Sequence, residues 1–233
     1  MKKLILLLVL IVTCSMHAQR LVETSVDLSN GQDIFLEFKF AHDIKIEQWN
    51  KNEIQIKAEV TIDDGEGNDY YSLKTEESSG TVEIRSDFGD YFKKKQKKDK
   101  NYWNGRNSTT NINYVVYVPM NATLKVKSIS GSVEANSYSG FLKTDLISGD
   151  VTVKKYDGEL HLKTISGDLD VTFKNADVNA KTLTGTIYAN LDVEMNDSSK
   201  QSGGHNKVQG KINNGGKLVK METISGDIFL RKG

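Results

Sequence analysis

Apolar and polar positions repeat every 18 residues between residues 122 and 193. The strings SISGSV, LISGDV, TISGDL and TLTGTI follow one another at this spacing, and their glycines are Gly131, Gly149, Gly167 and Gly185. A later copy, TISGDI, contains Gly226. A fixed period of this kind indicates stacked copies of one structural unit.

The period divides into two nonapeptides, because small residues also occur halfway, at Gly140 and Gly158. Within each nonapeptide the second, fourth and seventh positions are mostly apolar, and in the first copy they are Leu124, Val126 and Ile129. Side chains two apart on a strand point to the same face. Each nonapeptide therefore predicts a short strand followed by a corner, where glycine can adopt φ > 0 without steric cost.

We therefore predict an all-β fold, a β-solenoid: a single-stranded β-helix with 18-residue coils of two nonapeptides. The apolar positions are expected to form its core. The predicted structural turn residues are Gly131, Gly149, Gly167, Gly185 and Gly226. The seventh-position residues are expected to stack in chain order in one ladder, formed by Ile129, Ile147, Ile165 and Leu183.

Three other folds share parts of this pattern. A triangular helix of three hexapeptides also has 18-residue coils, but the internal symmetry here is nine, not six. A calcium-binding nonapeptide roll has GGxGxD turns, whereas the turns here read ISGD and YDGE. A plain antiparallel sandwich does not require identical spacing between successive turns.

Residues 1–18 are predicted to be a secretory signal peptide. Two lysines precede an apolar run from Leu4 to Val12, and a cleavage site fits before Gln19. The run is shorter than the roughly 20 residues of a transmembrane helix, so no transmembrane span is expected after cleavage. The one cysteine, Cys14, lies in this segment. Lipid attachment there is an alternative, although threonine is a poor residue before it.

Residues 19–112 are predicted to form an irregular N-terminal β region. Alternating apolar residues indicate strands at residues 35–40, 43–47, 53–60 and 81–85. These strands are either the first coils of the same solenoid or a small β-sandwich cap, which would protect an open end from pairing with other chains. Helical periodicity is absent after residue 18, so we expect almost no helix.

A lysine-rich loop is predicted at residues 92–110. Charge combined with aromatic stacking can hold an anionic polymer, such as lipopolysaccharide or an acidic glycan. The alternative is a solvated insertion between strands. The candidate binding residues are Lys93, Lys94, Lys95, Lys97, Lys98, Lys100, Trp103 and Arg106.

Residues 113–233 are predicted to form the regular solenoid. The strand NYVVYV and Pro119 lead into it. A polar, glycine-rich loop insertion at residues 194–207 interrupts it, and the pattern returns from Leu218 to Leu230.

The charge and the reactive side chains exclude several functions. The chain has 31 basic and 31 acidic residues, and 29 basic residues remain once the two lysines of the signal peptide are removed. No nucleic-acid partner is therefore expected. His42, His161 and His205 lack metal-ligand spacing, and no GxSxG or phosphate-binding loop occurs. No catalytic residue, metal or cofactor is predicted.

The repeated ISGD turns resemble those of a known family, the bacterial putative-adhesin family. The strand DIKIEQW and the segment YVPMNATLKVKSISGSV support the resemblance, which covers residues 35–231. The family consists of secreted β-strand-repeat domains similar to the head domains of autotransporter adhesins. It implies an extracytoplasmic β-solenoid with an adhesive or envelope role, and no catalytic motif carries over.

The leading hypothesis is a non-enzymatic, exported β-solenoid that acts in adhesion, binding or scaffolding at the cell envelope. Its expected partner is an envelope or host glycan or protein, and its expected location is the periplasm, the cell surface or the medium. One alternative is a polysaccharide lyase or hydrolase on a β-helix, which needs clustered carboxylates. Asp150 and Asp168 would stack on adjacent coils, either as turn residues or as a weak cation or glycan site. The other alternative is a periplasmic accessory of envelope-stress signalling.

Overall fold

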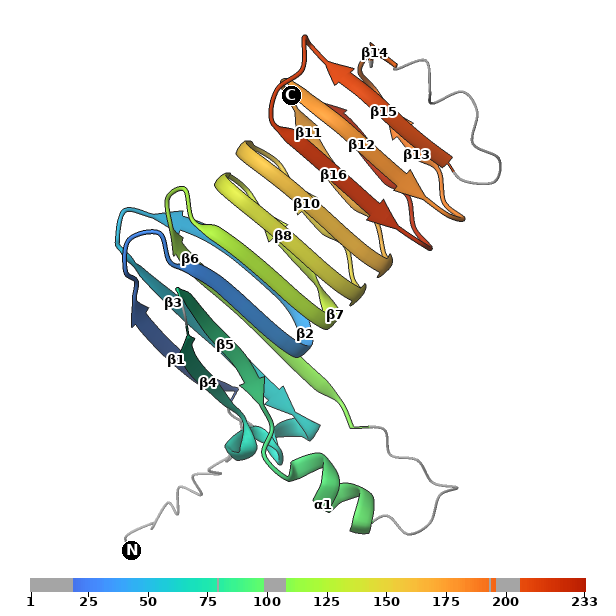
Figure 1. The fold of residues 1–233 in the computed structure, drawn as a ribbon. Helices are drawn as coiled ribbons and strands as arrows, with labels where there is room; N and C mark the ends of the chain where they lie inside the picture. Colours follow the sequence, from blue (N-terminus) through green and yellow to red (C-terminus); the bar gives the residue numbers. More distant parts are fainter. Residues whose placement is uncertain (1–18, 79, 99–107, 193, 196–205) are drawn as a thin grey trace, which may run out of the picture.

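A computed structural model shows the chain as one continuous stack of strands (Figure 1). The structure describes residues 19–78, 80–98, 108–192, 194–195 and 206–233. The predicted signal peptide lies outside the described residues, as does most of the insertion predicted at residues 194–207.

The described residues form 17 strands, one α-helix and two short 3-10 helices. The strands of the first half are β1 (Arg20–Asp27), β2 (Asp33–Trp49), β3 (Glu53–Ile62), β4 (Ser72–Ser78), β5 (Thr81–Asp87), β6 (Thr110–Pro119), β7 (Thr123–Ala135) and β8 (Tyr138–Ser148). Those of the second half are β9 (Val151–Val153), β10 (Tyr156–Ser166), β11 (Leu169–Phe173), β12 (Ala176–Thr182), β13 (Ile187–Ala189), β14 (Glu194–Met195), β15 (Asn206–Ile212), β16 (Leu218–Thr223) and β17 (Ile228–Lys232). The helices are η1 (Asp63–Gly65), η2 (Asn68–Tyr70) and α1 (Tyr91–Lys98).

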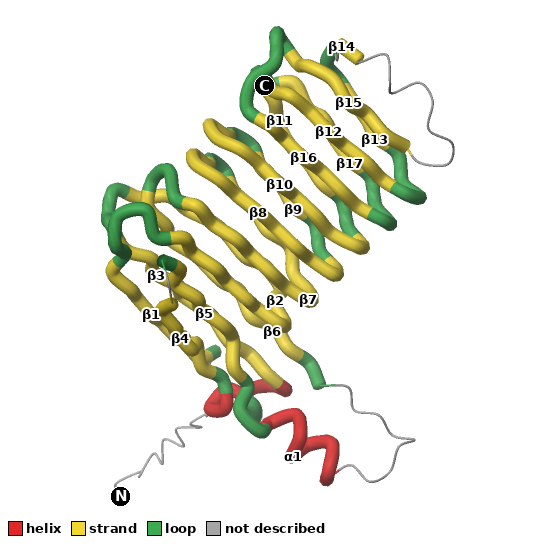
Figure 2. Tube along the Cα trace, viewed as in Figure 1, coloured by secondary structure: helices red, strands yellow, loops and turns green. Residues whose placement is uncertain are grey.

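The strands pair side by side in two layers, which Figures 1 and 2 show facing each other. The first layer runs β4, β5, β2, β7, β8, β10, β16, β12, β15, β14. The second layer runs β1, β3, β6, β2, β7, β9, β11, β17, β13. β2 and β7 occur in both because they bend from one layer into the other. Alternating side chains fill the space between the layers with an aliphatic and aromatic core.

The repeat region pairs in parallel at the spacing of the sequence repeat. Leu124 pairs with Leu142, and Leu142 with Leu160, each 18 residues on. The mostly β character of the chain is thus confirmed. A plain antiparallel sandwich is excluded for this region, because each repeat adds a parallel strand to both layers. We call one such strand pair and the corner between its strands a coil.

The order of the coils in space differs from their order in the chain. β16 lies between β10 and β12, and β17 lies between β11 and β13. The last coil of the chain is therefore intercalated between two earlier ones, and the expectation that Ile165 stacks directly on Leu183 is wrong. β15 makes this possible, because it pairs antiparallel with the outer edge of β12 and carries the chain to the far side.

A similar exchange occurs at the other end of the stack. β2 comes early in the chain, yet it lies between the coil formed by β5 and β6 and the coil formed by β7. The strands of residues 20–119 and those of the repeat therefore belong to one continuous sheet.

Antiparallel strands cover both layers at one end of the stack and the first layer at the other. β4 pairs with β5, and β3 pairs with β6 at one end, while β15 pairs with β12 at the other. These strands satisfy backbone groups of β5, β6 and β12, which as open parallel edges would be templates for pairing with other chains.

The seventh position of the repeat faces outward. Ile147 and Ile165 are exposed, while the preceding residues Leu146 and Thr164 are buried. The prediction that these isoleucines belong to the core is therefore wrong. Strand alternation continues inward from positions two and four to position six, so position seven must point to solvent.

The corner glycines of neighbouring coils approach each other closely. Gly131, Gly149, Gly167 and Gly226 have positive φ angles of 109°, 139°, 150° and 158°. A Cβ atom at Gly167 would lie 2.1 Å from the carbonyl oxygen of Gly149. Any side chain at this position would force the two coils apart.

Substitution of Gly167 by alanine tests this corner. The positive φ angle costs about 1–2 kcal/mol for a residue with a Cβ, and the overlap with Gly149 adds roughly 1–3 kcal/mol. The control is Gly31→Ala, because Gly31 also has a positive φ, of 77°, but no atom lies within 4 Å of the place its Cβ would take. We expect Gly167→Ala to lower the midpoint of urea unfolding clearly more than Gly31→Ala. Equal losses would show that the close approach is unimportant.

Candidate functional site

Threonines that directly precede two exposed isoleucines, Ile165 and Ile224, tie neighbouring coils together. The buried Thr164 hydroxyl donates a hydrogen bond to the carbonyl of Gly149 at 3.0 Å. Thr223 donates to Gly167 at 3.0 Å in the same way. A buried carbonyl left without a donor costs about 1–3 kcal/mol. The threonine of TISGD therefore has a structural role, which is to donate this hydrogen bond.

The aspartates of the motif also link the coils. One carboxylate oxygen of Asp150 accepts a hydrogen bond from the backbone N–H of Asp168 at 2.8 Å. Asp168 accepts from the N–H of Asp227 at 2.7 Å, and Asp227 from the N–H of Thr186 at 2.8 Å. Each charge therefore meets a backbone dipole of the next coil. The ISGD motif accordingly stabilises the corners between coils, and its polar groups are engaged in that role.

Five exposed aliphatic side chains form a continuous row beside these corners, which we call the aliphatic ladder. Between 41% and 50% of the surface of each is exposed. Its members, in spatial order, are Ile129, Ile147, Ile165, Ile224 and Leu183. At roughly 4.8 Å per strand, the ladder is about 19 Å long. Shallow hollows of about 280 and 230 Å³ lie along it.

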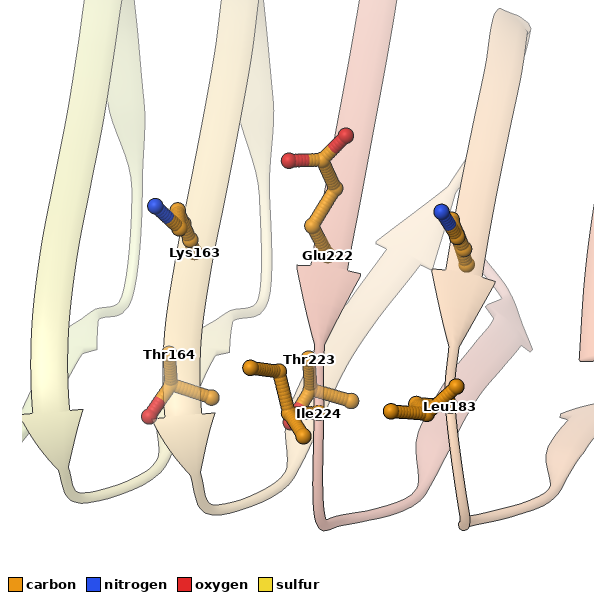
Figure 3. A pocket seen from close by; sticks show the side chains of 7 residues that line it. Lys163, Thr164, Leu183, Glu222, Thr223 and Ile224 are labelled. Atoms are coloured by element: carbon orange, nitrogen blue, oxygen red, sulfur yellow. The ribbon is translucent and has the colours of Figure 1, made fainter. Parts of the chain in front are cut away.

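A row of charged residues runs parallel to the aliphatic ladder, two residues earlier on each strand. The signs alternate along this charged row, which consists of Glu37, Lys127, Asp145, Lys163, Glu222 and Lys181. Figure 3 shows Lys163 and Glu222 in this row, with Ile224 and Leu183 nearer the turns. Ion pairs join Lys127 to Glu37 at 3.4 Å and Lys163 to Asp145 at 3.9 Å. Such cross-strand pairs stabilise stacked strands modestly.

The predicted lysine-rich loop begins with a helix. Residues 91–98 form α1, at the corner that joins β5 to β6. Its first turn is anchored by Tyr91 and Phe92, and the Phe92 ring packs edge-on against Phe40 at 5.6 Å between centroids. Lysine and glutamine favour helix once one face is held in this way. The prediction of a loop over the whole of residues 92–110 was wrong for this part.

The lysines of α1 do not all face solvent freely. The Lys95 Nζ atom forms an ion pair with Asp63 Oδ2 at 2.7 Å, and Tyr91 donates to the same oxygen at 2.6 Å. Lys94 lies over the ring of Tyr70, with its Nζ 5.2 Å from the ring centroid. Lys93 is exposed. The structure thus gives Lys95 a structural partner and leaves Lys93 and Lys94 accessible.

The remaining candidate residues lie beyond what the structure describes. Lys97 and Lys98 belong to α1, but only their backbone is described. Lys100, Trp103 and Arg106 fall in residues 99–107, outside the described residues. The binding role of this segment therefore stays a prediction.

Asp63 carries the tie between α1 and the end of β3. Partial burial acts to raise the pKa of Asp63, but hydrogen bonds from Lys95 and Tyr91 and from the backbone N–H of Thr109 lower it to about 2. The charged carboxylate thus stabilises the folded chain.

Neither a metal centre nor a membrane-spanning helix is found in the described part of the chain. No three histidine, cysteine, aspartate or glutamate side chains there gather in a way that could hold a metal ion. No described helix has both the length and the apolar character to cross a membrane.

Comparison with known proteins identifies a matching family model and one solved structure with a similar fold. Residues 118–231 match the model of the family described as toastrack DUF4097. A putative cell adhesion protein from Clostridium sporogenes ATCC 15579 aligns with a TM-score of 0.57 at 14% identity, over 93% of this chain and 100% of that one. At this identity the likeness shows the fold alone. A search of the curated proteins found no match.

Two further structures align more weakly. A putative adhesin from Bacteroides fragilis NCTC 9343 covers 93% of this chain and 99% of its own at 11% identity, with a TM-score of 0.23. A putative lipid binding protein from Parabacteroides distasonis ATCC 8503 covers 91% and 96% at 11% identity, also with a TM-score of 0.23. Scores of this size do not indicate a shared fold. The family resemblance predicted from the ISGD turns is confirmed by the family match.

The pH dependence of stability tests the contacts of Asp63. A carboxyl group with a lowered folded pKa stabilises the protein above its unfolded pKa, near 3.9. This contribution, on the order of 2 kcal/mol, is lost as the pH falls through the folded value of about 2.

Asp63→Asn should therefore lower the free energy of unfolding at pH 7, and the difference from wild type should vanish between pH 4 and pH 2. Urea unfolding at several pH values measures this. The neighbouring variant Asp64→Asn is the control, because Asp64 is exposed and makes no described contact. A pH-independent loss in Asp63→Asn would contradict the charge-based explanation.

Proposed function

We propose that this chain, which carries a toastrack DUF4097 domain over residues 118–231, is a non-enzymatic, exported β-solenoid that acts in adhesion or scaffolding at the cell envelope. The protein with a similar fold from Clostridium sporogenes is described as a putative cell adhesion protein. Residues 1–18, with their basic start and apolar run, support export.

The pairing of the strands supports the solenoid. Each repeat of 18 residues places one strand in each layer and stacks in register on its neighbours. Two strands per coil favour the two-nonapeptide unit over a triangular coil of three hexapeptides. The intercalated last coil continues the same stacking, so the solenoid runs from the coil of β5 and β6 to that of β12 and β13.

The arrangement of the carboxylates supports a binding role over catalysis. A glycoside hydrolase needs two carboxyl groups facing one bond. The stacked aspartates Asp150, Asp168 and Asp227 are each engaged with the backbone of the next coil. They follow the corner line one coil apart and do not gather around a groove.

The observation that carries the proposal is the outer face of the first layer, which joins the aliphatic ladder to the charged row. Exposed apolar rows of this length usually mark interaction sites. The charged row also identifies the occupant. The row begins with a negative charge at Glu37 and ends with a positive charge at Lys181. A second copy that packs against it with its row running in the opposite direction would therefore place a positive charge opposite every negative one.

In such a pair the two copies are related by a two-fold axis parallel to the strands. Lys163 of one copy then faces Asp145 of the other, and Lys127 faces Glu222. The same axis places Ile147 against Ile165, so both rows meet their own counterparts. This isologous contact is the commonest form of protein self-association. The scaffold would present two α1 helices, one near each end.

Sedimentation velocity of the purified protein tests the pairing. Wild type should form a dimer, and Lys163→Glu should raise the dimer dissociation constant by roughly tenfold or more, because it places like charges in contact. The charge swap Lys163→Glu with Asp145→Lys should restore the dimer. Lys232→Glu, on the second layer, is the control and should leave the dimer unchanged. A monomeric wild type, or a swap that fails to restore the dimer, would refute the paired scaffold.

Protease treatment of intact cells tests the location. A tagged chain that acts in adhesion should be cut on intact cells, and its N-terminus should begin near Gln19. Protection on intact cells with cutting after outer-membrane permeabilisation would exclude surface adhesion and leave a periplasmic scaffold. Recovery in the cytoplasm with residues 1–18 retained would refute export.

A further inference from the structure

A cleft of about 620 Å³ opens on the side of the stack opposite the ISGD corners. It lies among the turn from β9 to β10, the turn from β11 to β12, and the start of β16. The side chains of Lys154, Lys155, Lys174 and Lys217 line it, with Tyr156 and Thr172. Its volume falls in the range of small-ligand sites, roughly 300–1,000 Å³.

The intercalated coil explains why the stack is open here. The two turns on this side that precede the cleft, from β7 to β8 and from β9 to β10, each join one coil to the adjacent one. The turn at Lys174 and Asn175 must instead pass over a whole coil, because β16 and β17 lie between β11 and β12 in the stack. The ends of that coil reach the same place, where Gly233 N–H bonds the carbonyl of Phe173 and Asp177 N–H bonds that of Lys217. The two-residue turn at Lys174 and Asn175 and the strand ends beside it border the hollow.

The charge of the cleft is not balanced within the protein. Of the charged side chains that line it, four are lysines and one, Asp157, is acidic. Lys154 is paired with Glu134 at 2.6 Å and bonded to Asn136 at 3.0 Å. Among the described residues, no ion pair involves Lys155, Lys174 or Lys217. Three lysines that form no described ion pair therefore share one concave surface with a single acidic side chain, Asp157. This excess of positive side chains attracts anions.

We propose that this cleft binds a saccharide that carries phosphate or sulfate groups. Lysine acts as a point charge and suits such groups, whereas planar carboxylates are typically held by the fork of arginine, which the cleft lacks. Tyr156 offers a half-buried ring, fixed by a hydrogen bond to the carbonyl of Asn175 at 3.3 Å. The Thr172 hydroxyl and the Asp157 carboxylate can bond sugar hydroxyls. The proposal rests on the cleft alone and does not depend on where the protein resides or on its pairing.

Isothermal titration calorimetry with fructose 1,6-bisphosphate, beside neutral fructose, tests the proposal on the purified protein. Wild type should bind the bisphosphate saturably at one site and should not bind fructose. Binding should weaken as potassium chloride is raised, because the charges are partly exposed. The triple variant Lys155→Ser, Lys174→Ser and Lys217→Ser should raise the dissociation constant by roughly tenfold or more.

The matched control is Lys143→Ser, Lys207→Ser and Lys211→Ser. It removes the same charge from exposed positions that do not line the cleft. It should bind the bisphosphate as wild type does, and all three proteins should unfold at the same temperature. Absence of saturable binding to wild type would overturn the proposal. Equal loss in both triple variants would also overturn it, because the effect would then reflect net charge alone.

Discussion

The stack depends on how closely the backbones of neighbouring coils approach at one corner. The carbonyl oxygen of each corner glycine occupies the space in which the next glycine would carry a Cβ atom, as at Gly149 and Gly167. This contact requires glycine at the corner, and the roles of the other motif residues follow from the same close approach. Threonine hydroxyls reach the glycine carbonyls from the inside, and aspartate carboxylates hold the backbone N–H groups from the outside. Isoleucine remains on the surface between them.

The corner motif and the candidate binding surfaces are thus separated. The most regular residues of the chain maintain the stacking, while the outer columns can vary without disturbing it. The aliphatic ladder and the charged row occupy these outer columns, and α1 occupies a corner that lacks the motif. The lysine cleft occurs where a turn departs from the regular path. Surfaces of this kind can diverge among proteins that share one corner.

Much of the fold could be predicted from the repeat. The 18-residue register and the corner role of glycine follow directly from the spacing of Gly131, Gly149 and Gly167. The outward direction of Ile147 was also within reach, because two-residue alternation from Leu142 requires Leu146 to face inward. The apolar character of the seventh position predicts a core column, whereas the structure places this column on the surface.

The order of the coils in space could not be predicted from the repeat. All coils have the same corner, so TISGDI around Gly226 fits equally well at the end of the stack or between two other coils. Only the path of the chain through β15 decides this. The cleft depends on the same exchange, and its lysines come from three turns far apart in the sequence. No local pattern could have brought them together.

The intercalated coil also sets the order of assembly. During synthesis, β12 and β13 leave the ribosome before β16 and β17, but their parallel neighbours in the stack are those later strands. Their inner edges therefore stay unpaired until β16 and β17 arrive. This part of the stack cannot close earlier, because β16 and β17 fill the space between the coil of β10 and β11 and the coil of β12 and β13. They thus act as a lock that sets only after the strands on both sides of them have been made.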